Sequence, residues 1–226
     1  MKELLERIQT EGRVVGEGML KVDTFLNHGM DVGLIERIGQ EFADRFAGAG
    51  ATKVVTVEAS GIAPALFTAR ALGVPFVFAK KSLPAAVSEG VYSSQIQSFT
   101  RNKVFDVTVG RHLIHPGDRL LIVDDFLAHG STVGGLIDIA AQASANIVGA
   151  GIVVAKAFQG AEQALSGTGI DLFSLVVVDR ISGGRYRLRS HDGAVAEGPI
   201  GANGSLEPSQ QAQMFDHALL MPGVEA

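Results

Sequence analysis

Apolar, β-branched runs that alternate with helical segments constrain the fold of this chain more than any other feature. These runs lack polar alternation, as is typical of strands covered on both faces of a sheet. The alternation predicts an α/β fold with a mostly parallel central sheet, flanked by helices and wound by right-handed crossovers. The expected strands are residues 53–60, 75–81, 118–126, 146–158 and 172–181, and the expected helices are residues 34–50, 62–73 and 131–145.

One segment does not fit this alternation of strands and helices. Residues 91–110 alternate polar and apolar side chains around the sequence TRNK, which predicts an antiparallel hairpin inserted between the second and third core strands. The preceding residues, 80–90, contain the Ser, Pro and Gly of a flexible loop. Because long loops inside compact domains are usually functional, we expect this one to act as a lid.

The C-terminal region differs in composition from the rest of the chain. Residues 190–226 contain five acids and no Lys or Arg, so the formal net charge of −5 arises there. Residues 190–213 are rich in Gly, Pro, Ser and Gln, which predicts a largely disordered extension after a domain of residues 1–189. Residues 214–223 could form one apolar helical turn that docks on the domain.

Composition excludes several functional classes. Acids and bases balance within residues 1–189, so no basic face for nucleic acid is expected. The absence of cysteine excludes disulfides, thiolate metal sites and a cysteine nucleophile. Without a signal pattern or an apolar run of membrane length, we expect a cytoplasmic protein with no membrane partner. His112 and His115 lack an acid at metal-ligand spacing, so no metal site built from protein side chains is expected.

The sequence LLIVDDFLAHGST, residues 120–132, sets an apolar strand against Asp124 and Asp125 and then against a loop of small residues. A helix that begins near Ser131 or Thr132 would point its first amides into the loop, where they can bind a phosphate dianion. Ribose hydroxyls can donate to the two carboxylates, so the stretch suits a ribose 5-phosphate. A solvated strand end followed by a capped helix remains an alternative explanation. The glycine-rich motifs of nucleoside triphosphatases and dinucleotide-binding proteins do not occur.

An apolar run, two acids, two apolar residues and a small-residue loop ending in Ser or Thr resemble the phosphoribosyl pyrophosphate signature of the type I phosphoribosyltransferases. Residues 1–189 resemble, in order and spacing, the bacterial members of that family that act on xanthine. The stretches that carry this second resemblance are LKVDTFLNHGMD (20–31), RIGQEFADRFAGAGATKVVTVEASGIAPA (37–65), GVPFVFAKK (73–81), SFT (98–100) and GIVVAKAFQ (151–159). His129 departs from the Asn or Thr expected in the loop, and the C-terminal extension departs from relatives that end near residue 189.

The resemblance implies the type I phosphoribosyltransferase fold, with residues 1–33 contributing a hood over the base. It also implies transfer of phosphoribose from phosphoribosyl pyrophosphate to xanthine in purine salvage, by a homodimer, with Mg²⁺ held mainly by substrate and water. The residue roles that it implies are Asp124 and Asp125 as catalytic acids facing the ribose; Ala128, His129, Gly130, Ser131 and Thr132 at the 5-phosphate; Ala59, Ser60, Gly61, Lys80 and Lys81 at pyrophosphate; and Leu20, Asn27, Lys156 and Phe158 at the base.

Several alternatives remain open at this point. The loop EASGIAP, residues 58–64, can be an ordinary strand-to-helix turn capped by Ser60, and Lys80 and Lys81 can form a solvated edge. Lys156 can be an edge residue with an exposed amine. The function can be that of another purine phosphoribosyltransferase or of a non-catalytic regulator that binds phosphoribosyl pyrophosphate. The roughly 30 residues before the first core helix, with no basic excess, disfavour the DNA-binding domain that such a regulator needs.

Overall fold

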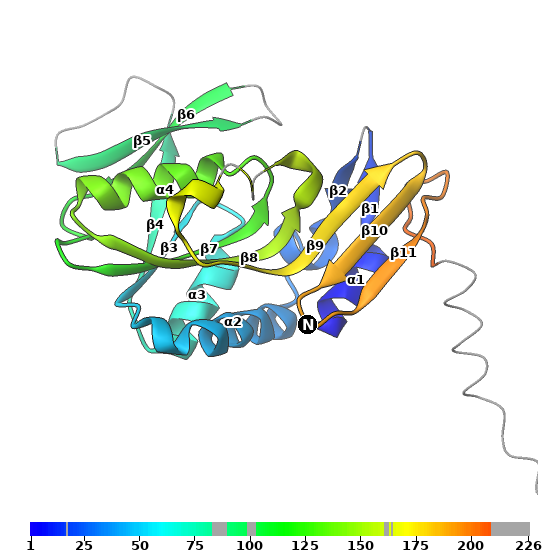
Figure 1. Ribbon diagram of the computed structural model, residues 1–226, viewed down its shortest axis with the longest axis horizontal. Coiled ribbons are helices and arrows are strands. Elements are labelled where there is room, and N and C mark those ends of the chain that lie inside the picture. Colours follow the sequence, from blue (N-terminus) through cyan, green and yellow to red (C-terminus); the bar gives the residue numbers. More distant parts are fainter. Residues whose placement is uncertain (17, 83–89, 99–102, 161–162, 164, 209–226) are drawn as a thin grey trace, which may run out of the picture.

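The computed structural model describes residues 1–16, 18–82, 90–98, 103–160, 163 and 165–208 (Figure 1). The α-helices are α1 (Lys2–Glu11), α2 (Val32–Phe46), α3 (Ile62–Leu72) and α4 (Ser131–Gln142). The strands are β1 (Arg13–Val15), β2 (Met19–Lys21), β3 (Lys53–Val57), β4 (Phe76–Ser82), β5 (Val91–Ser98), β6 (Lys103–Gly110), β7 (Arg119–Leu127), β8 (Asn146–Lys156), β9 (Leu172–Ser182), β10 (Arg185–Ser190) and β11 (Val195–Pro199).

The central sheet confirms the predicted fold class. Its order is β11-β10-β9-β8-β7-β3-β4-β6-β5. The inner strands β9, β8, β7, β3 and β4 run parallel, and the strands added at both edges run antiparallel. All five expected core strands are present, although the first ends at Val57 rather than at residue 60, because residues 58–61 turn into α3.

Helices cover both faces of the parallel strands (Figure 1). Helices α2 and α3 pack on one face, where Ile38 and Phe42 join a core that also includes Val123 and Val153. Helix α4 packs on the other face with a second apolar cluster. The inner strands are therefore buried on both sides, which explains why their sequences lack polar alternation. Within the described residues, no helix is both long enough and apolar enough to cross a membrane.

The predicted hairpin is confirmed as β5 and β6, which extend the sheet beyond β4. Helix α4 holds it through side chains. Gln142 donates to the Ser93 carbonyl oxygen (2.7 Å) and accepts from the Ser93 amide (3.2 Å), and Ser94 Oγ donates to Asp138 Oδ2 (2.9 Å). The expected lid falls largely on residues 83–89 and the hairpin turn on residues 99–102, which lie outside the described residues.

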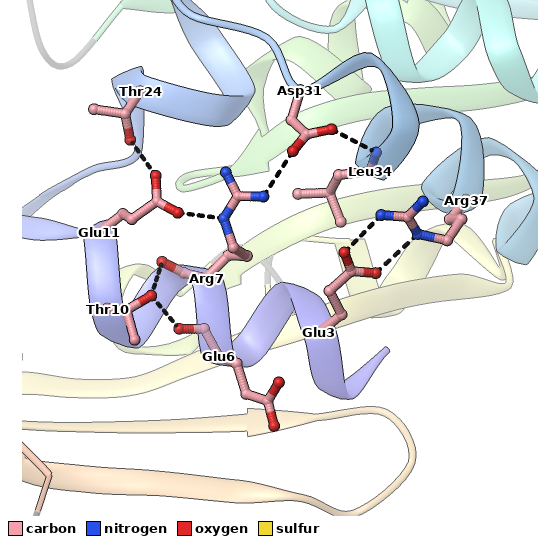
Figure 2. A network of polar contacts seen from close by, with 9 residues as sticks. All are labelled: Glu3, Glu6, Arg7, Thr10, Glu11, Thr24, Asp31, Leu34 and Arg37. Carbon is pink, nitrogen blue, oxygen red and sulfur yellow. Dashed lines mark hydrogen bonds and ion pairs between the residues drawn. The ribbon is translucent and has the colours of Figure 1, made fainter.

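Polar contacts fix the N-terminal hood to the core (Figure 2). The Arg7 guanidinium on α1 donates to Glu11 and, over 2.7 Å, to Asp31 at the start of α2. Glu11 in turn accepts from the Thr24 hydroxyl of a π-helical turn, Asp23–Asn27. Arg7 thus links α1, this turn and α2.

The prediction of a largely disordered extension from residue 190 is wrong for residues 190–208. The expected boundary falls at the end of β10, and β11 then pairs with β10 along its length. Beyond β11 the chain turns back, and the Val14 amide of β1 donates to the Gly204 carbonyl oxygen (2.8 Å). Pairing with the adjacent β10 and with the distant β1 supplies the order that composition does not predict. Residues 209–213 and the expected turn at 214–223 lie outside the described residues.

Gly198 provides a test of this ordered extension. A β-carbon at Gly198 would overlap the carbonyl oxygen of Glu207, whereas one at Gly48, an exposed position, would meet no atom within 4 Å. We expect Gly198→Ala to lower the free energy of unfolding by about 1–3 kcal/mol, as overpacking does. Gly48→Ala is the matched control and should leave it nearly unchanged. Equal stability of both variants in chemical denaturation would contradict this packing.

Candidate active site

The site lies where the strand order reverses direction. Strand β3 pairs in parallel with β4 on one side and with β7 on the other. Since the chain passes from β3 through α3 to β4 and later returns to β7, the carboxyl ends of β3 and β7 flank a topological switch point. The loops that follow these two strands, residues 58–61 and 128–130, meet at that edge of the sheet.

A cavity of about 270 Å³ opens between these loops. Nine of the predicted site residues line it: Ser60, Lys81, Asp124, Asp125, Ala128, His129, Gly130, Ser131 and Thr132. Residues that the sequence did not single out also line it: Val57, Glu58, Gln97, Phe126 and Leu127. The edge position of Glu58, directly after β3, was the one sequence signal that could have identified it.

The two carboxylates are almost entirely buried. Asp124 is 6% exposed and Asp125 is 7% exposed, and Asp124 Oδ1 accepts a hydrogen bond from the Asp125 amide (3.0 Å). Burial, with a smaller contribution from the neighbouring Asp125, raises the pKa of Asp124 well above its usual range, and Lys81 opposes the shift. A solvated strand end would not show such burial, so the geometry favours the ligand-binding alternative.

The small-residue loop ends in an anion-binding geometry. Helix α4 begins at Ser131, as the sequence predicts, and its N-cap is Gly130 in the left-handed region (φ 80°). No side chain caps this helix end, so its first amides remain directed toward the cavity. The Ser131 hydroxyl donates instead to the Gln97 carbonyl oxygen (2.9 Å), which ties the loop to β5.

The loop after β3 contributes less side-chain chemistry than expected. Gly61, rather than Ser60, is the N-cap of α3, and no side chain caps that helix, so the alternative of a Ser60 cap is not supported. Ser60 lines the cavity, whereas Ala59 and Gly61 do not. Glu58 accepts from the Lys81 amide (2.6 Å), which holds the loop against β4.

The two adjacent lysines separate. Successive side chains of a strand point to opposite faces, so Lys80 and Lys81 on β4 leave the strand in opposite directions. Lys81 lines it, and Lys80 does not.

None of the four predicted base-binding residues lines this cavity. Leu20 on β2 is 4% exposed and belongs to the apolar core beneath the hood, whereas Phe158 is 43% exposed. Asn27 ends the π-helical turn, and its Oδ1 is buried with no hydrogen-bond partner among the described residues. An amide oxygen in this state is available to a ligand that donates an N–H.

Lys156 lies at the end of β8, next to the cavity wall. Its Nζ lies 5.2 Å from the ring centroid of Phe126, a cavity residue. Burial lowers the pKa of Lys156, and the carboxylate of Asp125 opposes the shift. The ammonium group is therefore partly desolvated and in the field of Asp125, which disfavours a freely solvated edge residue.

One further contact joins the small-residue loop after β7 to the segment after Lys156. The ring Nδ1 of His129 lies 3.1 Å from the Gln159 carbonyl oxygen. The side chain that departs from the expected Asn or Thr is thus built into the wall of the cavity.

Within the described residues, no group of three or more His, Asp or Glu side chains is arranged to hold a metal ion.

A family model for the phosphoribosyl transferase domain matches residues 22–165, which include both cavity loops. The protein is therefore a phosphoribosyltransferase, an enzyme of the pentosyltransferase class.

Curated relatives narrow this class. A xanthine phosphoribosyltransferase of Heliobacterium modesticaldum is 51% identical over 185 residues, which are 82% of this chain and 98% of the relative. One of Streptococcus pneumoniae is 45% identical over 192 residues, 85% of this chain and all of the relative. The chain belongs to the family of xanthine phosphoribosyltransferases.

Solved structures support the fold alone. Adenine phosphoribosyltransferase of Thermoanaerobacter pseudethanolicus superposes with a TM-score of 0.65 at 20% identity, covering 77% of this chain and 98% of that one. The Trypanosoma brucei enzyme superposes with a TM-score of 0.64 at 16% identity, covering 95% of this chain and 90% of that one.

Replacing each acid tests its role. Asp124→Asn and Asp125→Asn keep the side-chain shape but remove the negative charge that would stabilise a positively charged sugar ring. We expect at least one of them to reduce kcat by about tenfold or more, which is on the order of 1.4 kcal/mol in the barrier. Asp44→Asn removes an exposed carboxylate far along α2 and is the control. Near-normal turnover in both site variants would show that the pair is only a strand terminus.

Proposed function

We propose that this enzyme transfers the 5-phosphoribosyl group of phosphoribosyl pyrophosphate to xanthine, forming xanthosine 5′-monophosphate and pyrophosphate. The observation that carries the proposal is the buried acid pair facing an uncapped helix N-terminus across one cavity. The amides at the start of α4 would bind the 5-phosphate, and the acids would face the ribose hydroxyls. The names of the relatives support xanthine as the base.

Departure of pyrophosphate from C1 leaves positive charge on the ribose ring. Preorganised carboxylates near that carbon stabilise the charge as it develops, and Asp124 and Asp125 are the groups available at the cavity wall. Lys81 lines the same cavity and supplies a cation for the departing pyrophosphate. The roles of Ala59, Ser60 and Gly61 at pyrophosphate rest on their backbone amides. Lys80 stays a prediction of the sequence alone.

A magnesium ion, where phosphoribosyl pyrophosphate carries one, would neutralise the charge of the leaving group. Such an ion would be held by pyrophosphate oxygens, ribose hydroxyls and water. We name no protein ligand for it. The homodimer and the cytoplasmic location likewise stay predictions.

Base choice depends on the hood and the end of β8. Lys156 can donate to the 6-oxygen of a purine, and its positive charge favours xanthine, which is partly anionic near neutral pH. The buried Asn27 amide, whose Oδ1 has no partner in the described residues, can meet the polar edge of the ring. Adenine presents an amino donor where Lys156 needs an acceptor, a mismatch worth a few kcal/mol in a closed site.

An activity screen tests the proposal. The enzyme would be mixed with phosphoribosyl pyrophosphate, magnesium and one purine at a time, and release of pyrophosphate would be measured. We expect the order xanthine, then guanine or hypoxanthine, with adenine effectively excluded. Use of adenine as well as xanthine would refute this description of the base site. No release with any base would favour a non-catalytic regulator that binds phosphoribosyl pyrophosphate.

Lys156→Ala separates the two aspects of base recognition. Without the ammonium donor we expect kcat/KM for xanthine to fall and the discrimination against adenine to narrow in the same variant. Lys2→Ala, which removes an exposed lysine of α1, is the control and should change neither quantity. An unchanged ratio of xanthine to adenine activity in Lys156→Ala would remove Lys156 from the base site.

A further inference from the structure

Thr56 carries a hydroxyl group that the fold of β3 does not require. Its side chain is 0% exposed, and Oγ1 has no hydrogen-bond partner among the described residues. The neighbouring residues of the strand are Val54, Val55 and Val57. A valine at position 56 would have nearly the same shape without the cost of burying an unpaired hydroxyl. The oxygen therefore lowers stability in this state and calls for another explanation.

The position of Gly61 locates this oxygen relative to the active site. A β-carbon built on Gly61 would lie 2.5 Å from Asp124 Oδ1 and would also overlap Thr56 Oγ1. The two oxygens thus flank the same small space beneath the turn that begins α3. This space exists only because residue 61 has no side chain.

We propose that Thr56 is a positioning residue whose hydroxyl donates a hydrogen bond to the Asp124 carboxylate when phosphoribosyl pyrophosphate is bound. Thr56 does not line the cavity, so it would act through Asp124 rather than on the substrate. The Asp125 amide already donates to Oδ1 of Asp124, and a second donor from Thr56 would hold the carboxylate from the neighbouring strand β3 as well as from its own strand. The inference rests on the proposed function of Asp124 as an acid that faces the ribose.

The surrounding charges explain why such a donor is useful. Asp125 on β7 and Glu58 after β3 are acids that line the same cavity. Lys81 on β4 lines it as a cation, and His129 lines it from the loop after β7. Burial and Asp125 raise the pKa of Asp124, so its charged form is disfavoured, and Lys81 compensates only in part. A hydrogen bond donated to a carboxylate favours the charged form, which is the form that stabilises a cationic sugar ring.

Thr56→Val removes the donor and keeps the shape. We expect kcat with xanthine to fall by about tenfold while the Tm stays equal or rises, because the buried unpaired oxygen is lost. The acidic limb of the kcat profile should move to higher pH, since loss of a donor raises the pKa of Asp124 further. Thr56→Ser, which keeps the hydroxyl, should retain most of the rate. Thr68→Val removes an equally buried hydroxyl that bonds to the Pro64 carbonyl oxygen in α3, and it should change neither kcat nor the pH profile.

A double-mutant cycle distinguishes action through Asp124 from a general effect on packing. In an Asp124→Asn background, Thr56→Val should cause little further loss of kcat, because the acceptor charge is already absent. Additive losses of kcat in this cycle would overturn the inference. A wild-type rate in Thr56→Val or a tenfold loss in Thr56→Ser would overturn it too. So would a Thr56→Val variant whose rate loss is accompanied by a lowered Tm. A wild-type enzyme without activity on any purine would overturn the proposed function as well as this inference.

Discussion

Burial of the parallel strands on both faces is the constraint on which the rest of the structure depends. With α2 and α3 on one side and α4 on the other, β3, β7 and β8 must carry apolar side chains along their lengths. Polar groups enter where the strands lose their cover, as at the carboxyl edge. Asp124 and Asp125 stand at that point of β7, and the reversal of strand order beside β3 opens the cavity there. Thr56 is the exception, a polar side chain within a covered strand.

The same constraint explains which parts of the fold could be predicted from the sequence. Doubly covered strands and amphipathic helices leave local patterns, so the core strands, the three expected helices and the inserted hairpin were found close to their observed bounds. The extension was not predicted, because its composition suggested disorder and gave no sign of the pairing of β11 with β10 or of residues 204 and 205 with β1. Leu188 and Ala196 face each other in the β10–β11 pair, and Gly198 is small where the chain passes Glu207. Glycine and proline there were interpreted as disorder, although the alternation of charged and apolar residues in RYRLRS, residues 185–190, was a signal of the strand β10 with which β11 pairs.

The candidate site was predictable to the extent that backbone position decides it. The loop after β7 and the acids before it follow directly from strand, turn and helix, and they line one cavity. Side-chain direction was harder, since Lys80 and Lys81 are equivalent in sequence but alternate on β4. Asn27 depends on a π-helical turn and on the contacts of Arg7 that hold the hood, and neither leaves a sequence pattern of its own. Glu58 and Gln97 line the cavity through contacts with residues far along the chain. Glu58 accepts from the Lys81 amide, and the Gln97 carbonyl oxygen accepts from the Ser131 hydroxyl.

Asp125 connects the sugar-facing and base-facing parts of the proposed mechanism. Its carboxylate lines the cavity at the end of β7, and it also opposes the effect of burial on the pKa of Lys156 at the end of β8. An ionised Asp125 therefore helps to keep Lys156 charged, which is the state in which the lysine can donate to a purine oxygen. The lysine in turn lies over the ring of Phe126, which follows the acid pair on β7. Because neighbouring parallel strands end at the same edge, the charge of Asp125 and the charge of Lys156 are electrostatically linked, and changing Asp125 should affect base recognition as well as turnover.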